Sequence, residues 1–215
     1  MSNHVTMQVD GRPVKAFYGD AAGSVGVVIL HEFWGLNAHI EGIAKRFAGA
    51  GIPALAVDLY DGVVAKDRQE ASQKMQALDA SRVMRIILAG VDELHARGIQ
   101  KVAVLGFCMG GALTLAASAR VPGLDGAVVF YGIPQAFDAE AVKVPLLLHF
   151  ATHDDWCSPE RVSALEAALR KAGVSFELHR YDAAHAFFND TRPEVHDAAK
   201  SKLAWERTLA FLKNR

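Results

Sequence analysis

Residues 101–112 read KVAVLGFCMGGA, an apolar, β-branched run that passes directly into a glycine-rich turn. A run without polar alternation predicts a strand covered on both faces, and the apolar spacing of Leu113, Leu115 and Ala116 predicts a helix after it. The turn has the spacing G-x-C-x-G, in which small residues at 106 and 110 allow a sharp strand-to-helix bend. This segment therefore predicts a parallel α/β sheet with Cys108 held above its edge.

The same alternation of short apolar runs and amphipathic segments extends along the chain. Further strands are expected at 25–30, 53–57, 126–130 and 144–149, and a more alternating run at 175–181 predicts a strand nearer an edge. Helical periodicity occurs at 40–47, 84–94, 162–169 and 203–212, and most of these segments end near glycine. Residues 5–9 and 14–18, split by Asp10-Gly11, predict an edge hairpin, and the polar segment 61–80 predicts a partly helical surface excursion.

This order of elements predicts one α/β domain over residues 1–215. Its core is expected to be an open, mostly parallel, twisted sheet flanked by helices on both faces.

Composition narrows the class of function. The 215 residues are 51% hydrophobic with a net charge of −1, which indicates a globular chain with no general attraction to nucleic acid or anionic lipid. Two cysteines do not make a disulfide scaffold, and no apolar run approaches the roughly 20 residues of a membrane span. The first residues lack the features of a secretory signal. We expect a cytoplasmic monomer or small homo-oligomer that acts on a small molecule, without nucleic-acid or membrane partners.

Cys108 is the candidate nucleophile. A thiolate at a helix N-terminus is stabilised by the helix dipole and by free backbone N–H groups. The N–H of Met109 is then the natural first donor to an oxyanion. The alternative is that Cys108 is merely a small buried apolar residue.

A nucleophile of this kind needs a base, and the base needs an acid to orient it. His185 is the candidate base among nine histidines, because it lies in a loop just after the last expected strand. His149 is expected to be packed within a strand, and the helix or strand patterns favour solvated faces for His95, His179 and His196. The acid should follow the strand at 144–149, where the spacing allows either Asp154 or Asp155. The order nucleophile, acid, histidine is that of an α/β-hydrolase.

The first strong strand ends in His31-Glu-Phe-Trp-Gly-Leu-Asn37, where such folds place a second oxyanion donor. The N–H of Phe33 is the candidate donor, and Glu32 and Trp34 are expected above the sheet near Cys108. A carboxylate beside a thiolate is repulsive, so one pKa would rise or the two groups would share a proton. The alternative for Glu32 is an ordinary acid on a surface loop.

With these motifs placed, the chain resembles the dienelactone hydrolase (carboxymethylenebutenolidase) family over roughly residues 12–213. The resemblance is carried by the segments 31–37, 58–60, 106–111, 155–159 and 185–193. The family pattern D-x-x-[V/S]-P favours Asp155 as the acid. The resemblance also implies that Glu32 accepts the thiol proton until substrate binds, and that Cys108 attacks a lactone or enol-ester carbonyl to give an acyl thioester. No cofactor or metal is implied.

The resemblance further implies a set of substrate contacts: Trp34, Tyr60, Arg68, Tyr131, Phe187 and Asn189. The sequence departs from the family here, because well-studied members clamp the substrate carboxylate with two arginines and Asn189 stands at one of those positions. Arg68 matches the other position, and Arg192 is a nearby substitute for the missing one. Loss of a bidentate arginine contact would shift substrate preference.

Two other functions remain open. One is a general carboxylesterase or thioesterase on the same scaffold. The other is a non-catalytic redox sensor, in which Cys157 would have to approach Cys108. The turn at 105–111 lacks the third-position glycine of a dinucleotide loop and the G-K-[S/T] of a P-loop, and Gly35 replaces the second histidine of a zincin. The segment His153-Asp154-Asp155 lacks a second cluster to complete a metal site.

Overall fold

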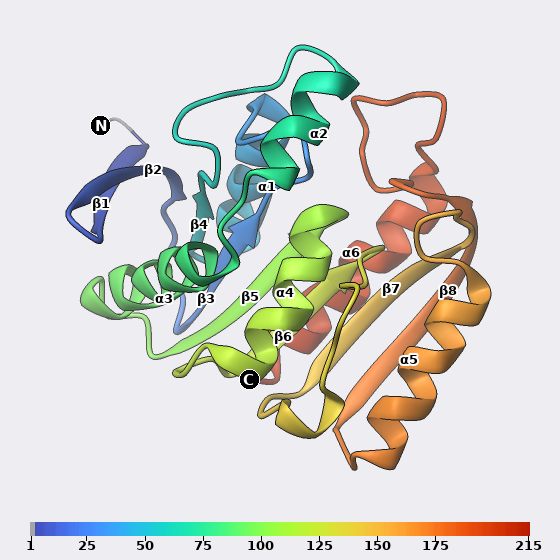
Figure 1. The fold of residues 1–215 in the computed structure, drawn as a ribbon. Helices are drawn as coiled ribbons and strands as arrows, with labels where there is room; N and C mark the ends of the chain where they lie inside the picture. The colour runs from blue at the N-terminus through green and yellow to red at the C-terminus, as the bar shows by residue number, and fades with distance from the viewer. Residues whose placement is uncertain (1–2) are drawn as a thin grey trace.

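A single eight-stranded sheet forms the centre of the molecule in the computed structural model, which describes residues 3–215 (Figure 1). The strands are β1 (His4–Val9), β2 (Arg12–Gly19), β3 (Val25–Leu30), β4 (Ala54–Val57), β5 (Lys101–Phe107), β6 (Gly126–Phe130), β7 (Leu146–His153) and β8 (Phe176–Ala184). Their order across the sheet is β1-β2-β4-β3-β5-β6-β7-β8. Pairing is antiparallel for β1 with β2 and for β2 with β4, and parallel from β4 to β8. The predicted mostly parallel sheet is confirmed.

Helices cover both faces of the sheet. One face packs against α3 (Ala80–Ala96), α4 (Met109–Arg120) and α5 (Pro159–Lys171), and the other packs against α1 (Ala38–Gly49) and α6 (Ala198–Lys213). Figure 1 shows α3, α4 and α5 in front of the sheet, with α1 and α6 behind it. Because both faces are buried, β6 and most of β3 and β5 are apolar without alternation.

The hairpin at the start of the chain follows from its turn residues. Asp10 and Gly11 both adopt positive φ angles, 54° and 71°, as a tight two-residue turn between twisted strands requires. The hairpin places β1 at one edge of the sheet. β8 lies at the other edge, and both positions are as the sequence predicts. The segment 61–80 is partly helical as expected, and its helix is α2 (Arg68–Gln76).

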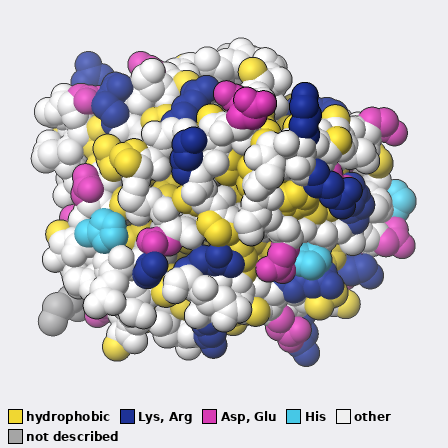
Figure 2. All heavy atoms as spheres, turned by 90° about the horizontal axis from the view of Figure 1, so that it is seen from below, with side chains coloured by type: hydrophobic (Ala, Val, Ile, Leu, Met, Phe, Trp, Pro, Cys, Tyr) yellow, Lys and Arg dark blue, Asp and Glu magenta, His cyan; other side chains and the backbone are white. Residues whose placement is uncertain are grey.

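Charged side chains of both signs are interspersed over the side of the molecule where β5 begins (Figure 2). A local ion pair at this end joins Lys101 Nζ to Asp125 Oδ1 at 3.2 Å. Over residues 3–215, no helix is both long enough and apolar enough to cross a membrane.

The carboxyl ends of the parallel strands lie at the opposite edge. Leu30, Phe107, Phe130, His153 and Ala184 end β3, β5, β6, β7 and β8 in that order. The residues that follow them, from His31 to His185, are therefore brought to one edge of the sheet. Ligands of open α/β sheets bind at this edge.

Candidate active site

The turn after β5 holds Cys108 in a strained conformation. Its φ of 55° and ψ of −116° place it in a region that non-glycine residues rarely adopt, at a cost of about 1–3 kcal/mol. The turn is tight because a Cβ at Gly106 would overlap the carbonyl of Gly110, and a Cβ at Gly110 would overlap the carbonyl of Leu30. The Cys108 N–H donates to the Phe130 carbonyl at 3.0 Å. The expected strand-to-helix elbow is thus built against the ends of β3 and β6.

Cys108 lies immediately before the first residue of α4, where its carbonyl accepts the N–H of Ala112 at 3.0 Å. The residue is half-buried and makes no disulfide. Its thiol therefore lies at the positive end of the α4 dipole, beside backbone N–H groups that have no partner within the helix.

His185 lies against both the thiol and a carboxylate. Its Nδ1 is 2.7 Å from Asp154 Oδ2, and Nε2 is the ring nitrogen left for Cys108. Burial lowers the pKa of His185, but the hydrogen bond to Asp154 and the adjacent Cys108 thiol outweigh it and raise the pKa to about 10. The structure therefore brings the predicted nucleophile and the predicted base together.

The carboxylate that contacts His185 belongs to Asp154, whereas the expected acid was Asp155. β7 extends to His153, so Asp154 is the first residue of the turn, and its side chain is completely buried. Its Oδ1 accepts the N–H groups of Trp156 and Cys157 at 2.8 and 2.9 Å, which leaves Oδ2 for the imidazole. Burial raises the pKa of Asp154, but the bonds to His185 and to the two amides outweigh this effect and hold the pKa below its ordinary value. Asp155 is exposed on the outside of the turn.

Glu32 is buried beside this group and is held by two side chains. Asn189 Nδ2 donates to Glu32 Oε2 at 2.6 Å, and the Tyr131 hydroxyl lies 3.5 Å from Oε1. The Asn189 amide is oriented because its Oδ1 accepts both the N–H and the hydroxyl of Thr191, at 3.0 and 2.6 Å. Burial raises the pKa of Glu32 more than Asn189 and the charge of His185 lower it. Burial thus stabilises the neutral form of this carboxyl relative to an exposed one.

The two candidate oxyanion donors lie on neighbouring segments. Met109 opens α4 directly after Cys108, and Phe33 follows the end of β3. The elbow packs closely on that end, since a Cβ at Gly110 would contact the carbonyls of both Leu30 and His31. The segment that carries Phe33 is thus a neighbour of the Cys108 turn.

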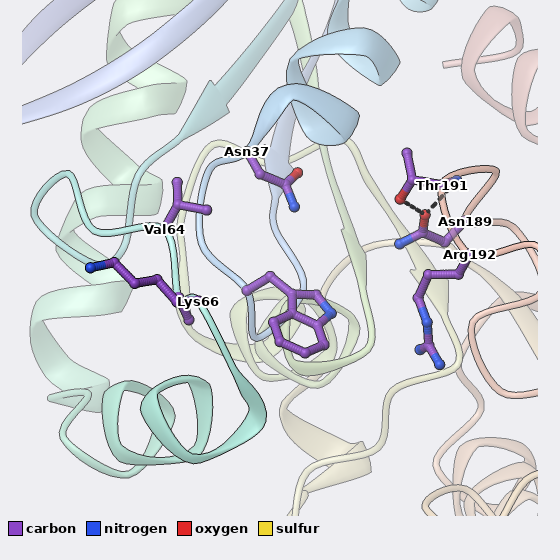
Figure 3. Close-up of a pocket in the computed structure, with 8 residues that line it drawn as sticks. Asn37, Val64, Lys66, Asn189, Thr191 and Arg192 are labelled. Carbon is purple, nitrogen blue, oxygen red and sulfur yellow. Dashed lines mark hydrogen bonds between the residues drawn. The ribbon is translucent and has the colours of Figure 1, made fainter.

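A cavity of about 320 Å³ opens at this edge of the sheet. It is lined by Trp34, Asn37, Val64, Ala65, Lys66, Asn189, Thr191 and Arg192. Figure 3 shows Val64 and Lys66 on one side of the cavity and Asn189, Thr191 and Arg192 on the other. The lining contains two cationic side chains and no carboxylate, and the Arg192 guanidinium pairs with Glu194 at 2.8 Å. The cavity lining thus carries cationic side chains, of which Arg192 is already paired with an acid outside the lining and Lys66 extends away from the cavity (Figure 3).

The predicted substrate contacts divide into three groups. Trp34 and Asn189 line the cavity, although Asn189 is 2% exposed and bonded to Glu32. Tyr131 and Tyr60 are buried beside the site: the rings of Tyr131 and His185 are 5.1 Å apart, and the Tyr60 hydroxyl donates to Met109 Sδ at 3.2 Å.

The other two lie outside the cavity lining. Phe187 is completely buried, where it packs against Tyr131 and Tyr181. Arg68 is exposed at the start of α2. Lys66, in the same loop segment that suggested Arg68, lines the cavity instead, and the loose spacing of that loop gave no means to distinguish them.

No group of three or more histidine, cysteine, aspartate and glutamate side chains with metal-site geometry occurs within residues 3–215. His153 is directed to Asp182, with Nε2 2.7 Å from Oδ1, while Asp154 faces His185. The segment His153-Asp154-Asp155 is thus divided between two different partners.

The strand order, the strained cysteine elbow after β5, and a carboxylate and a histidine after β7 and β8 together define an α/β-hydrolase fold. A putative dienelactone hydrolase from Klebsiella pneumoniae has the same fold, with a TM-score of 0.90, 23% identity, and coverage of 100% of this chain and 99% of its own.

Sequence comparison defines the family more narrowly. The model of the Dienelactone hydrolase family matches residues 14–215. A protein from Aquifex pyrophilus named "Protein usf" is 34% identical, and a "Putative carboxymethylenebutenolidase" from Aquifex aeolicus is 32% identical, each over 99% of this chain and 98% of its own length. The chain belongs to the dienelactone hydrolase family and is a hydrolase of that class.

Proposed function

We propose that this protein hydrolyses a small lactone or enol ester through Cys108, His185 and Asp154. The observation that carries the proposal is the position of His185, bonded to Asp154 at 2.7 Å and adjacent to the thiol of a strained elbow cysteine. An imidazole held in this way accepts the thiol proton, and the paired carboxylate stabilises the resulting imidazolium.

The chemistry proceeds in two halves. The Cys108 thiolate attacks the carbonyl carbon, and the N–H groups of Met109 and Phe33 stabilise the developing oxyanion. The intermediate collapses by breaking the bond between the acyl carbon and the leaving oxygen, which takes the proton from His185. Water then attacks the thioester, with His185 as its base, and releases the carboxylic acid and the free thiol.

Glu32 has a modulating role in this proposal. An ionised carboxylate near the thiolate would repel it, whereas the neutral carboxyl favoured by burial does not. The bond from Asn189 fixes the place of the Glu32 carboxyl. The expected consequence is that Glu32 influences how readily Cys108 ionises.

The arginine of the cavity lining favours a substrate that carries an anionic group. A carboxylate on the substrate would compete with Glu194 for the Arg192 guanidinium. A neutral carboxylesterase or thioesterase substrate is the second candidate. It is favoured by Asn189, which stands where the family has its second arginine. The Asn189 amide is neutral and already donates to Glu32, so it offers no second positive charge to a substrate carboxylate.

The properties of Cys157 argue against a redox-sensing role, in which this residue would form a disulfide with Cys108. Burial and the charge of Asp154 raise the pKa of the Cys157 thiol to about 12, which leaves little thiolate for disulfide exchange at neutral pH.

A paired substrate panel tests the proposal. We expect the purified protein to hydrolyse an enol lactone bearing a carboxylate, and to be more active on it than on the methyl ester of that carboxylate or on aryl esters and acyl thioesters. Cys108→Ala should remove this turnover while its circular dichroism spectrum stays native. Near wild-type turnover in Cys108→Ala contradicts the mechanism, and a preference for uncharged esters selects the second candidate.

Replacement of the cation in the cavity tests the anionic substrate separately. We expect Arg192→Met to raise KM for the carboxylate substrate about tenfold, on the order of 1.4 kcal/mol, because one charge-assisted contact is lost. KM for the neutral methyl ester should change little. Arg170→Met, which removes an exposed arginine of α5 that pairs with Glu166, is the matched control, and an equal effect of both variants would contradict the assignment.

A further inference from the structure

His31 is a completely buried side chain that joins the ends of two strands. It directly follows β3, and its Nε2 lies 3.1 Å from the backbone N–H of Leu59, beyond the end of β4. Its Nδ1 lies 2.5 Å from the carbonyl oxygen of Glu32. The ring also packs edge-on against Tyr60, with centroids 4.9 Å apart. The imidazole is thus held on several sides.

These partners determine the protonation state of the ring. A backbone N–H only donates, so Nε2 must accept from Leu59 and carries no proton. A carbonyl only accepts, so Nδ1 must carry the proton that it donates to Glu32. Burial lowers the pKa of His31 in the same direction, against a smaller opposing effect of the Glu32 carbonyl. His31 is a neutral ring in one tautomer.

The bond to Glu32 has a consequence on the other side of the same peptide group. The carbonyl of Glu32 and the N–H of Phe33 belong to one planar trans peptide unit, in which they point in opposite directions. The Glu32 carbonyl also accepts the N–H of Gly35 at 3.3 Å. Fixing the direction of this carbonyl therefore fixes the direction of the Phe33 N–H.

The peptide of the other donor is fixed in the same manner. The carbonyl of Cys108 accepts the N–H of Ala112, and this sets the direction of the Met109 N–H. In that case the first turn of α4 supplies the bond. After β3 no helix begins until Ala38, and the side chain of His31 supplies the shorter of the two bonds to the Glu32 carbonyl, at 2.5 Å against 3.3 Å for the N–H of Gly35.

We infer that His31 is a positioning residue that aims the Phe33 N–H at the oxyanion. The inference rests on the proposed function, because the oxyanion forms only in that reaction. It assigns the His31 imidazole no part in proton transfer. His31 acts through the Glu32–Phe33 peptide and does not contact the reacting atoms.

Two substitutions distinguish orientation from simple filling of space. His31→Leu fills much of the volume but bonds neither Glu32 nor Leu59. We expect its kcat to fall by on the order of 100-fold, the effect of losing one oxyanion donor, with KM nearly unchanged. In His31→Gln the side-chain amide can donate to the Glu32 carbonyl and accept from the Leu59 N–H, so we expect most of the kcat to return.

Alkylation of Cys108 by iodoacetamide provides a readout without an oxyanion. Displacement of iodide by sulfur passes through no tetrahedral intermediate, so His31→Leu should be alkylated at nearly the wild-type rate. The pH dependence of kcat in His31→Gln should match that of the wild type, because His31 does not titrate in the reaction. If His31→Leu fails to fold, His31→Met makes the same comparison.

The possible outcomes separate this inference from the proposed function. A folded His31→Leu variant with wild-type kcat overturns the inference, as does a His31→Gln variant that remains as slow as His31→Leu. A loss of alkylation equal to the loss of kcat also overturns it, because the whole site would then be disturbed. Retained turnover in Cys108→Ala instead overturns the proposed function itself.

Discussion

Two histidines of this protein, His149 completely buried and His185 half-buried, experience opposite environments. His149 lies within β7, where Nδ1 is 2.8 Å from the Tyr181 hydroxyl and Nε2 is 3.2 Å from Thr208 Oγ1. Burial, with nearby positive charge, holds the pKa of His149 well below its ordinary value. His185, just after β8, faces a carboxylate and a thiol, and its pKa is raised to about 10 against the effect of burial. The charge of the partner, more than burial, decides whether a histidine can carry a proton.

The hydrogen bonds around His149 show why it stays neutral. Arg207 donates to the Tyr181 oxygen at 3.1 Å, so the Tyr181 hydroxyl must donate to Nδ1. Thr208 donates to the Ala204 carbonyl at 2.8 Å, and its oxygen then accepts from Nε2. A second proton on this ring would oppose the Tyr181 donor. The partners of His149 thus favour its neutral form, whereas those of His185 favour its protonated form.

The largest expected effect comes from removing the charge beside His185. Asp154→Asn gives the imidazole a neutral partner, as His149 has, and we expect kcat to fall on the order of 10³- to 10⁴-fold because the imidazolium is no longer stabilised. Steady-state hydrolysis of the lactone measures the loss. Asp155→Asn, one residue away and exposed, is the control and should retain close to wild-type kcat. Equal losses of kcat in both variants would contradict the assignment of Asp154 as the partner of His185.

A smaller effect is expected at His149, and on stability only. His149→Phe keeps the ring volume but leaves Tyr181 and Thr208 without one partner each, which should lower the free energy of unfolding by about 1–3 kcal/mol. Urea unfolding measures this change, and kcat at a temperature where the variant is folded should be unaltered. A large loss of kcat would show that the two clusters are coupled.

The contrast also extends to the pH dependence of stability, where the two histidines act in opposite directions. Because the folded pKa of His149 is depressed, the unfolded chain binds the extra proton first, and stability falls as pH drops below about 6.5. Because the folded pKa of His185 is raised, its contribution is complete below about 6.5 and is lost as pH rises toward about 10. Each slope is at most about 1.4 kcal/mol per pH unit.

Two variants test which histidine causes the loss of stability at acid pH and which causes the loss at alkaline pH. His149→Phe should reduce the loss of stability between pH 6.5 and 5, a loss shared by other histidines of depressed pKa: His31, His39 and His179. Cys108→Ala should reduce the alkaline loss, because the thiol is one cause of the raised pKa of His185. Thermal unfolding across this pH range is the measurement. An unchanged alkaline slope in Cys108→Ala would contradict the coupling of thiol and imidazole.

The sequence predicted the features that local chemistry determines. Apolar runs gave the strands, Asp10-Gly11 gave the hairpin, and the small residues around Cys108 gave the elbow, because each depends on neighbours in the chain. The choice between two adjacent aspartates failed for a different reason. β7 runs to His153, beyond the expected end at His149, and irregular pairing with β8 near Ala151 sets where the strand ends. That pairing with a distant strand determines which carboxylate faces His185.

Sequence reasoning predicted only part of the cavity lining: Trp34, Asn189 and Arg192 were expected, and Lys66 was not. Phe187 was expected at the substrate and is instead packed inside, whereas Lys66 and Arg192 come to opposite sides of the cavity from loops far apart in sequence. Their approach depends on how the loops fold over the sheet, which no local pattern encodes. The role of His31 was missed for the same reason, since its partner Leu59 belongs to another strand end.

The elbow at Cys108 has a consequence for the timing of reactivity during folding. Its strained backbone is held by Leu30 at the end of β3 and by Phe130 at the end of β6, through close approach to Gly110 and a bond to Cys108 itself. None of these contacts is local, so they form only when the central strands have paired. In an unfolded or nascent chain Cys108 has none of these neighbours, and the geometry that the proposed nucleophile needs forms only together with the finished sheet.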